Sequence, residues 1–288
     1  MVTKRVHKRQ LLLIEDDYVR QVLEYTLAHY VNEHKLDLHA IIVEGNHVHR
    51  VDTDPKGNRP DFLRDFHSFV ARQLNRYYKE GDAFFSGKQT NIVDNESAND
   101  VLQRIVYTMG NPVADGIERE GKNHKGTRLR WPQPDRVIKR PEGFWRSREQ
   151  GGKAPDTVVL RFTRPPGFDD LSDEELDQLL ESRILAYEKH HRETRDAAGK
   201  PFRCDVTNKL ADPRSFPKSP HKLFGLAPLI GAKIKEQRIA AIQRLQRFRA
   251  KHDDARRRHK AGEEGVVFPF GSYLAVRRWN VQVEPAPT

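Results

Sequence analysis

The fold of this chain is decided by residues 38–51, which read LHAIIVEGNHVHRV. The run Leu38–Val43 is apolar and β-branched, which favours a buried central strand. It leads to His47 and His49 at spacing i, i+2, so on a strand both imidazoles lie on one face, roughly 7 Å apart. We therefore expect residues 36–51 to form a central strand, interrupted just before the first histidine. Two such rings can converge on one metal ion, although a pair of half-exposed histidines at a strand end is the simpler interpretation of this spacing alone.

Helices and strands alternate around this stretch. Apolar residues at helical spacing predict helices over residues 18–33 and 60–79. The run at 10–14 predicts a first strand, and residues 84–93 predict a short strand or hairpin. This alternation fits a compact α/β sandwich, with one sheet and helices packed on it.

A second informative segment, residues 99–117, reads NDVLQRIVYTMGNPVADGI. Its apolar residues repeat at helical spacing behind an N-cap at its first or second position. Tyr107 and Asn111 are four residues apart and share one face of this helix. Pro112 lacks a backbone N–H and disfavours helix at the residue before it, so we expect a kink or break at Asn111. Alone, Tyr107 fits a core aromatic residue as well as a catalytic one.

Together the two segments resemble a known family. Gly-Asn-His-Val-His, followed after roughly sixty residues by Tyr-x-x-x-Asn-Pro-Val-x-x-Gly-Ile, is similar to the single-tyrosine transposases, and most to their REP-associated branch. These enzymes carry a His-hydrophobic-His (HUH) pair and a helix with Tyr-x-x-x-Asn-Pro-Val. The resemblance covers residues 9–120, and a looser likeness extends to Phe268–Tyr273. It implies a ferredoxin-like fold with an antiparallel sheet, the histidines on a central strand and the tyrosine on a helix facing it.

Three features depart from the family pattern. Val43-Glu44-Gly45-Asn46 stands where the family usually has Met-Pro-Asn or Met-Ser-Asn. Arg50 follows the second histidine, where the family usually has an apolar residue, and residues 118–130 form an unusual insertion. None of these departures removes a presumed catalytic group.

The resemblance implies roles for four residues. His47, His49 and the amide oxygen of Asn111 would hold a divalent ion that polarises a scissile phosphate. Tyr107 would attack that phosphate to give a 5′-phosphotyrosine link, from which DNA is rejoined without a nucleotide cofactor. The ligand types alone leave the metal open, and the resemblance indicates Mg²⁺ or Mn²⁺. The implied substrate is single-stranded DNA, with hairpin-forming repeat elements as the target.

Two alternatives remain open. One is another HUH endonuclease, of the replication-initiator or relaxase type, which often uses Glu or a third His as the last ligand and sometimes two tyrosines on one helix. The single Tyr107 on this helix, with Asn111 at the ligand position, favours the transposase. The other alternative is a domesticated, non-catalytic nucleic-acid-binding derivative, which would have lost a ligand or the nucleophile.

Charge supports an anionic partner. The chain of 288 residues has a formal net charge of +10. Residues 227–261 carry eleven basic and three acidic side chains, with apolar residues at helical spacing, which predicts an amphipathic basic helix. Such a helix could follow a phosphate backbone or simply be a solvated face. The candidate DNA-binding residues on it are Arg244, Arg247, Arg256, Arg257 and Arg258.

We divide the chain into three parts. Residues 9–120 form the transposase-like catalytic domain, and 121–155, rich in Gly, Lys, Arg and Pro, form a linker or loop. Residues 156–288 form a basic C-terminal extension, predicted as an accessory DNA-binding region. In this extension we expect a strand at 157–162, a helix capped by Ser172 and Glu175, and a final β-hairpin.

Location and assembly are only broadly constrained. The apolar run at residues 11–14 is too short for a signal-peptide core or a membrane span, so we expect a cytoplasmic protein without a membrane partner. Cys204 is the only cysteine, which excludes an intrachain disulfide and a cysteine zinc site. The sequence leaves monomer and homodimer open.

Overall fold

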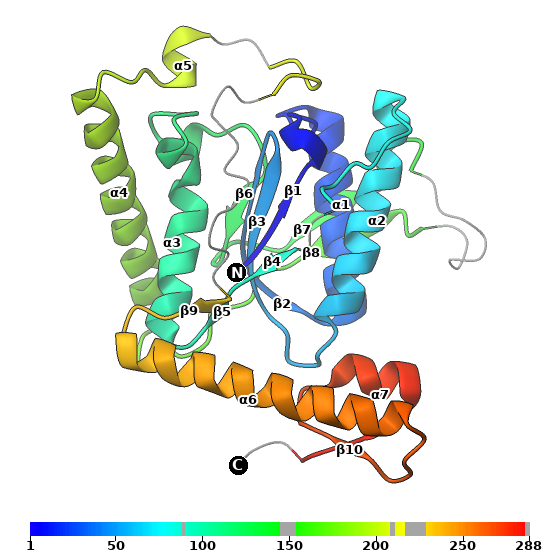
Figure 1. Ribbon diagram of the computed structural model, residues 1–288. Coiled ribbons are helices and arrows are strands. Elements are labelled where there is room, and N and C mark those ends of the chain that lie inside the picture. Colours follow the sequence, from blue (N-terminus) through cyan, green and yellow to red (C-terminus); the bar gives the residue numbers. More distant parts are fainter. Residues whose placement is uncertain (88–89, 145–153, 208–210, 217–228, 286–288) are drawn as a thin grey trace.

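The centre of the molecule is a five-stranded antiparallel sheet with strand order β4-β1-β3-β2-β6. The computed structural model describes residues 1–87, 90–144, 154–207, 211–216 and 229–285. The strands are β1 (Val2–Arg5), β2 (Asp37–Glu44), β3 (His47–Thr53), β4 (Asn91–Ile92) and β6 (Arg128–Arg130). Helices cover both faces of this sheet (Figure 1).

The first four strands have the ferredoxin-like arrangement. Helix α1 (Asp17–His34) connects β1 to β2, and α2 (Arg59–Tyr78) connects β3 to β4. Each helix therefore joins two strands that have one other strand between them, and both helices lie together on one face of the sheet (Figure 1). The predicted α/β class, with helices packed on an antiparallel sheet, is confirmed.

Local sequence explains the limits of α1 and α2. The carboxylate of Asp16 accepts a hydrogen bond from the N–H of Val19 at 3.0 Å and caps the start of α1. Lys35, the residue after the helix, has the left-handed backbone conformation that ends it. Helix α2 has proline in its first turn and buries its aromatic side chains, among them Phe62 and Phe66, on the side that faces the sheet and α1.

The histidine stretch is a hairpin and not the single interrupted strand that we expected. Glu44 and His47 are paired residues on either side of a two-residue turn, Gly45-Asn46, a dipeptide that favours hairpins. Gly45 also lies against Leu11, where an added Cβ would come within 3.1 Å of the leucine Cδ2. The reversal brings Glu44 directly beside His47.

The prediction of a first strand at residues 10–14 is wrong. This run forms a turn under the hairpin: Leu12 and Leu13 are buried in the core, and the N–H of Leu13 donates to Gly45 O at 2.8 Å. The first strand is instead β1, whose basic residues conceal it from a hydrophobic pattern. A buried apolar run can thus fill the core without pairing into a sheet. Of the region expected as a strand or hairpin at 84–93, the described part contributes β4 to the sheet and an isolated bridge from Phe85 to Val6.

The other face of the sheet is covered by α3 (Ala98–Ala114), and α4 (Asp173–Ala197) packs outside it (Figure 1). The predicted break at Asn111 is wrong, because α3 continues through Pro112 and ends at Ala114. The proline removes only the one hydrogen bond that its own N–H would donate to the carbonyl four residues earlier, and the N–H of Asp115 donates to Asn111 O at 2.8 Å.

Close packing of α3 on α4 depends on one glycine. An added Cβ at Gly110 would lie 2.4 Å from Cδ1 of Tyr187. Alanine favours a helix over glycine by about 1 kcal/mol, but overpacking costs about 1–3 kcal/mol. We therefore expect Gly110→Ala to lower the free energy of unfolding by up to about 2 kcal/mol in urea titrations. In a Tyr187→Ala background the same change should be neutral or stabilising, and an equal loss in both backgrounds would contradict this packing argument.

The described residues of 121–155, a range expected as a linker, contribute to the folded body. Strand β6 pairs with β2 at the edge of the sheet, and β7 (Arg136–Lys139) pairs with β8 (Thr157–Leu160), the strand predicted at 157–162. The predicted helix after Ser172 is α4, and its capping box with Glu175 is present. Short helices η1 (His7–Arg9), η2 (Gly121–Asn123) and α5 (Arg203–Val206) complete this body.

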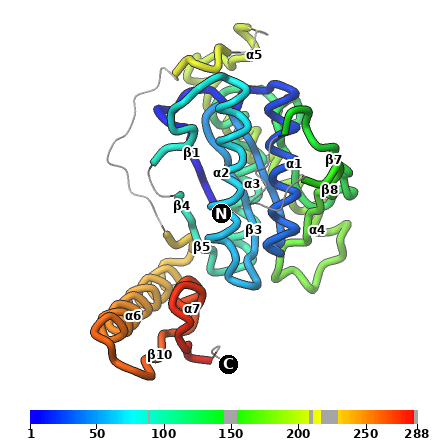
Figure 2. The backbone as a smooth tube through the Cα atoms, turned by 90° about the vertical axis from the view of Figure 1, so that its right-hand side faces the viewer, coloured from blue at the N-terminus to red at the C-terminus, as the bar shows by residue number. Residues whose placement is uncertain are grey.

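The C-terminal part forms a small module at one end of the sheet (Figures 1 and 2). It contains α6 (Lys235–Lys260), α7 (Tyr273–Trp279), β10 (Val267–Phe268) and β11 (Gln282–Val283). The expected final hairpin is wrong: β10 and β11 pair in parallel because α7 lies between them in the chain. A short parallel pair, β5 (Asp94–Asn95) with β9 (Ile230–Gly231), connects this module to the sheet domain.

The basic helix is confirmed as a helix, but its apolar stripe is not buried as an amphipathic pattern suggests. Ile239 and Ile242 are more than 40% exposed, whereas the buried positions of α6 are Ala241 and Ala255. No helix in the described ranges combines the length and apolar character that a membrane span requires.

Candidate active site

The predicted site lies between β3 and α3. Alternation along β3 directs His47 and His49 toward α3, while Arg50 points to the opposite face, where its guanidinium lies 4.1 Å from the ring centroid of Phe62 on α2. The two imidazole rings are 4.6 Å apart between centroids and nearly perpendicular, at 85°. The i, i+2 spacing thus gives a pair of neighbouring rings on one face.

A polar neighbour fixes each imidazole. Nδ1 of His47 donates to Oδ1 of Asn46 at 2.7 Å, which leaves Nε2 as the nitrogen with a free lone pair. Nδ1 of His49 lies 2.8 Å from Oγ1 of Thr3, which is its pairing partner on β1. Such second contacts orient imidazole rings at metal sites, and here they leave both Nε2 atoms available.

Helix α3 supplies the other two predicted residues. Nδ2 of Asn111 lies 3.4 Å from Nε2 of His47, and the amide can present its oxygen at the same place by rotating through 180°. The ring of Tyr107 lies 5.4 Å from that of His49, in an edge-on arrangement. The structure therefore brings together the four residues that the sequence proposed as ligands and nucleophile.

Burial keeps both histidines neutral. It lowers the pKa of His47, against the opposing charge of Asp115 and with a further reduction from Arg5. Burial also lowers the pKa of His49 well below its ordinary value, and His47 and Arg5 act in the same direction. Neutral imidazole is the form that binds metal ions.

The same environment keeps Tyr107 protonated when no cation is present. Burial raises the pKa of its phenol, and the negative charges of Asp115 and Glu44 raise it further. Nucleophilic attack requires this proton to leave. Added positive charge beside Tyr107 would reverse the electrostatic part of this effect.

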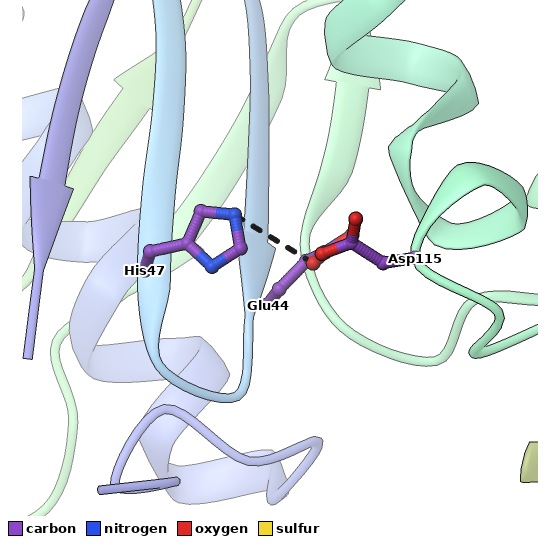
Figure 3. Close-up of side chains that lie close together, drawn as sticks. All are labelled: Glu44, His47 and Asp115. Atoms are coloured by element: carbon purple, nitrogen blue, oxygen red, sulfur yellow. Dashed lines mark ion pairs between the residues drawn. The ribbon is translucent and has the colours of Figure 1, made fainter. Parts of the chain in front are cut away.

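Two carboxylates at the site were not predicted. Oε2 of Glu44 lies 3.7 Å from Nε2 of His47, and one donor atom each of Glu44, His47 and Asp115 lie within 4.8 Å of one another (Figure 3). In the sequence, Glu44 stands out only as a departure from the family pattern. Asp115 follows Asn111 by four residues, so helical spacing could have placed it on the same face.

These residues fit a divalent cation. The donor set offers imidazole nitrogens, an amide oxygen and carboxylate oxygens, which suit borderline and hard divalent ions. Oε1 of Glu44 is buried and has no hydrogen-bond partner among the described residues. A buried carboxylate oxygen without a partner is costly unless a cation or a proton compensates it.

A cleft of about 320 Å³ opens beside His47. It is lined by three arginines and three acidic residues: Arg5, Arg9, Arg203, Glu15, Glu44 and Asp115. Arg203 is already paired with Glu15 at 3.1 Å, whereas Arg5 is the residue of β1 that pairs with His47, so its guanidinium is the one best placed to face a phosphate at the site.

The structure divides the five arginines proposed for DNA binding on α6 into two groups. Arg244 pairs with Glu96, and Arg257 and Arg258 pair with Asp254 and Glu263. Arg247 and Arg256 are exposed, and neither has an ion-pair partner in the described part of the chain. None of the five lies among the residues that line the cleft beside His47.

No family model, curated protein or solved structure matches this chain. The family resemblance therefore rests on the two motifs, and the ligand and nucleophile roles stay predictions.

Proposed function

We propose that this chain is a single-tyrosine transposase of the HUH type, which cuts and rejoins single-stranded DNA in the cytoplasm. The observation that carries this proposal is the juxtaposition of Tyr107 with His47, His49 and Asn111, which come from two segments distant in the sequence. A core aromatic residue would not require a buried imidazole at its edge that is itself in contact with a second one.

The chain's residues divide the proposed reaction among them. His47, His49 and Asn111 would hold Mg²⁺ or Mn²⁺, and the bound ion supplies positive charge beside the scissile phosphate and the phenol. Tyr107 loses its phenol proton and attacks the phosphorus atom, so that a P–O bond to tyrosine forms while the bond to the 3′-oxygen breaks. The released 3′-oxygen takes up a proton. A 3′-hydroxyl of another strand then attacks the phosphotyrosine and restores Tyr107.

The electrostatics around the site support a nucleic-acid substrate. Arg5 acts on both histidines electrostatically and lines the cleft beside them with Arg9. Arginines are suited to phosphate oxygens because they donate two parallel hydrogen bonds. Hairpin-forming repeat elements as the particular target come from the family resemblance alone.

The direct test is formation of a covalent complex. The full chain is incubated with single-stranded oligonucleotides that carry the repeats flanking its gene, with Mn²⁺ or Mg²⁺, and separated under denaturing conditions. We expect a protein–DNA adduct that requires the metal and disappears with EDTA. If these oligonucleotides are bound but no adduct forms under any metal condition, the chain is a non-catalytic binder and the proposal is wrong.

The basic helix gives an independent prediction. The double charge reversal Arg247→Glu with Arg256→Glu should weaken DNA binding. It should also make the slope of log K against the logarithm of the salt concentration shallower by about two, one for each lost phosphate contact. Both guanidinium groups are exposed and have no acidic partner in the described ranges. Binding is measured by fluorescence anisotropy at several salt concentrations. Arg183→Glu, an exposed arginine on α4, is the control for charge alone. An unchanged slope in the double variant would indicate that this face of α6 is solvated and does not contact DNA.

A further inference from the structure

We propose that Glu44 and Asp115 are two further ligands of the divalent cation, so that the protein binds its ion before DNA arrives. This inference rests on the proposed site but not on its strand-transfer chemistry. It changes the expected ligand set from two imidazoles and an amide to a set with two carboxylates.

Geometry is the first support. The hairpin turn places Glu44 opposite His47, and the last turn of α3 is followed by Asp115, so the two carboxylates approach the same imidazole from different elements (Figure 3). The donor atoms of the three residues lie within 4.8 Å of one another. A single ion at the centre of such a group is within reach of all three after small rotations of the side chains.

The burial of Glu44 is the second, independent support. The residue is 2% exposed, and its Oε1 atom has no hydrogen-bond partner in the described structure. Its other oxygen, Oε2, lies 3.7 Å from Nε2 of the neutral His47, and the carboxyl group also hydrogen-bonds with the side chains of Asp115 and Asn111. Buried carboxylates are normally paired or coordinate metals, and Figure 3 shows this one directed at the imidazole and at Asp115.

The hydrogen bonds of His47 indicate one ion. Its Nδ1 atom is occupied by the side chain of Asn46, so only Nε2 can serve as a ligand atom. Asn111 and Glu44 both approach this same Nε2 atom, at 3.4 and 3.7 Å. Asn111 and Glu44 therefore share a position beside Nε2 of His47, and Asp115 offers an oxygen within 4.8 Å of donor atoms of His47 and Glu44.

Charge gives the functional consequence. His47, His49 and Asn111 are neutral ligands and would leave the charge of the ion uncompensated until a phosphate arrives. Two carboxylates compensate it within the protein, which raises affinity for the ion in the absence of DNA. The mixture of nitrogen and oxygen donors suits Mn²⁺, which is also a convenient probe.

The test measures Mn²⁺ binding without DNA, from the electron paramagnetic resonance signal of free Mn²⁺ in titrations of the full chain. We expect one bound ion per chain, and an affinity reduced at least tenfold in Glu44→Gln and in Asp115→Asn. Asp115 is exposed, so its variant should remain folded even if Glu44→Gln does not. Glu120→Gln, on the exposed surface, is the matched control and should bind like the wild type.

The outcomes separate this inference from the proposed function. The inference is overturned if the wild type binds no Mn²⁺ without DNA, or if Asp115→Asn binds it as tightly as the wild type. A chain that binds Mn²⁺ through both carboxylates but forms no covalent adduct would retain this inference and contradict the strand transferase. A chain that forms the adduct but binds Mn²⁺ only in the presence of DNA would support the strand transferase and contradict this inference.

Discussion

Tyr107→Phe should reduce formation of the covalent protein–DNA adduct by at least about a thousandfold, because it removes the only oxygen of that side chain that can attack phosphorus. The substitution keeps the ring, which lies 5.4 Å from His49 and 6.5 Å from the ring of Tyr187. Packing and metal binding should therefore persist. Adduct is quantified by denaturing gel with labelled DNA, at equal concentrations of folded protein.

Tyr187→Phe is the matched control for that loss. Tyr187 is the other tyrosine beside the site, but it comes from α4, and burial raises its pKa to about 12, with Tyr107 and Asp115 acting in the same direction. We expect this variant to form the adduct at close to the wild-type level. If Tyr107→Phe retains the adduct and Tyr187→Phe loses it, the assigned nucleophile is wrong.

Asp52→Asn should lower the free energy of unfolding by about 3–5 kcal/mol, the usual cost of removing one partner from a buried ion pair. The carboxylate of Asp52 accepts Nε of Arg50 at 2.5 Å and Nε of Arg59 at 2.9 Å. The side chains of Asp52 and Arg50 are 1% and 3% exposed, so the variant leaves a buried guanidinium without a compensating charge. Urea denaturation at pH 7 measures the loss.

The same ion pair predicts a dependence on pH. Burial alone raises the pKa of Asp52, but the charges of Arg50 and Arg59 outweigh burial and hold that pKa at about 2. A lowered pKa in the folded state means that the stabilisation is complete above the unfolded value of about 3.9 and is lost as the pH falls toward 2. The difference in stability between wild type and Asp52→Asn should therefore shrink between about pH 4 and pH 2.

An exposed ion pair provides the control for this network. Asp135→Asn removes the partner of Arg161, and both side chains are substantially exposed, so we expect almost no change in the free energy of unfolding at pH 7. A loss of similar size in the Asp52 and Asp135 variants would contradict the role assigned to the buried network.

The structure gives the two departures from the family pattern near the histidines different meanings. Arg50 points away from the site, and its network with Asp52 and Phe62 lies on the face covered by α2. Arg50 therefore contributes to the stability of the fold and not to the site. Glu44 lies within the site, 3.7 Å from His47, where it is a proposed ligand of the cation.

Periodicity predicted those parts of the fold and site that depend on spacing along one element. The i, i+2 spacing placed His47 and His49 on one face, and the i, i+4 spacing placed Tyr107 and Asn111 on one face. Helices α1, α2 and α4 followed from their apolar repeats or their caps. These features require no knowledge of the rest of the chain.

Contacts between elements could not be predicted in this way. The position of Glu44 beside His47 depends on a two-residue turn, and that of Asp115 on how α3 lies against the sheet. The strand expected at 10–14 became a turn because burial in the core satisfied its leucines without sheet pairing. The helix continued past Asn111 although Pro112 removes one of its hydrogen bonds, because the packing of α3, whose residues Gly110–Val113 are buried, overrode the local preference before proline.

Mass spectrometry of the wild-type adduct tests the central claim most directly. The full chain is allowed to react with single-stranded repeat DNA in the presence of Mn²⁺, the DNA is digested with nuclease, and tryptic peptides are sequenced. We predict a nucleotide joined through its 5′-phosphate to Tyr107, in a peptide recovered only when metal is present. A nucleotide on any other residue, or a linkage through a 3′-phosphate, would contradict this account.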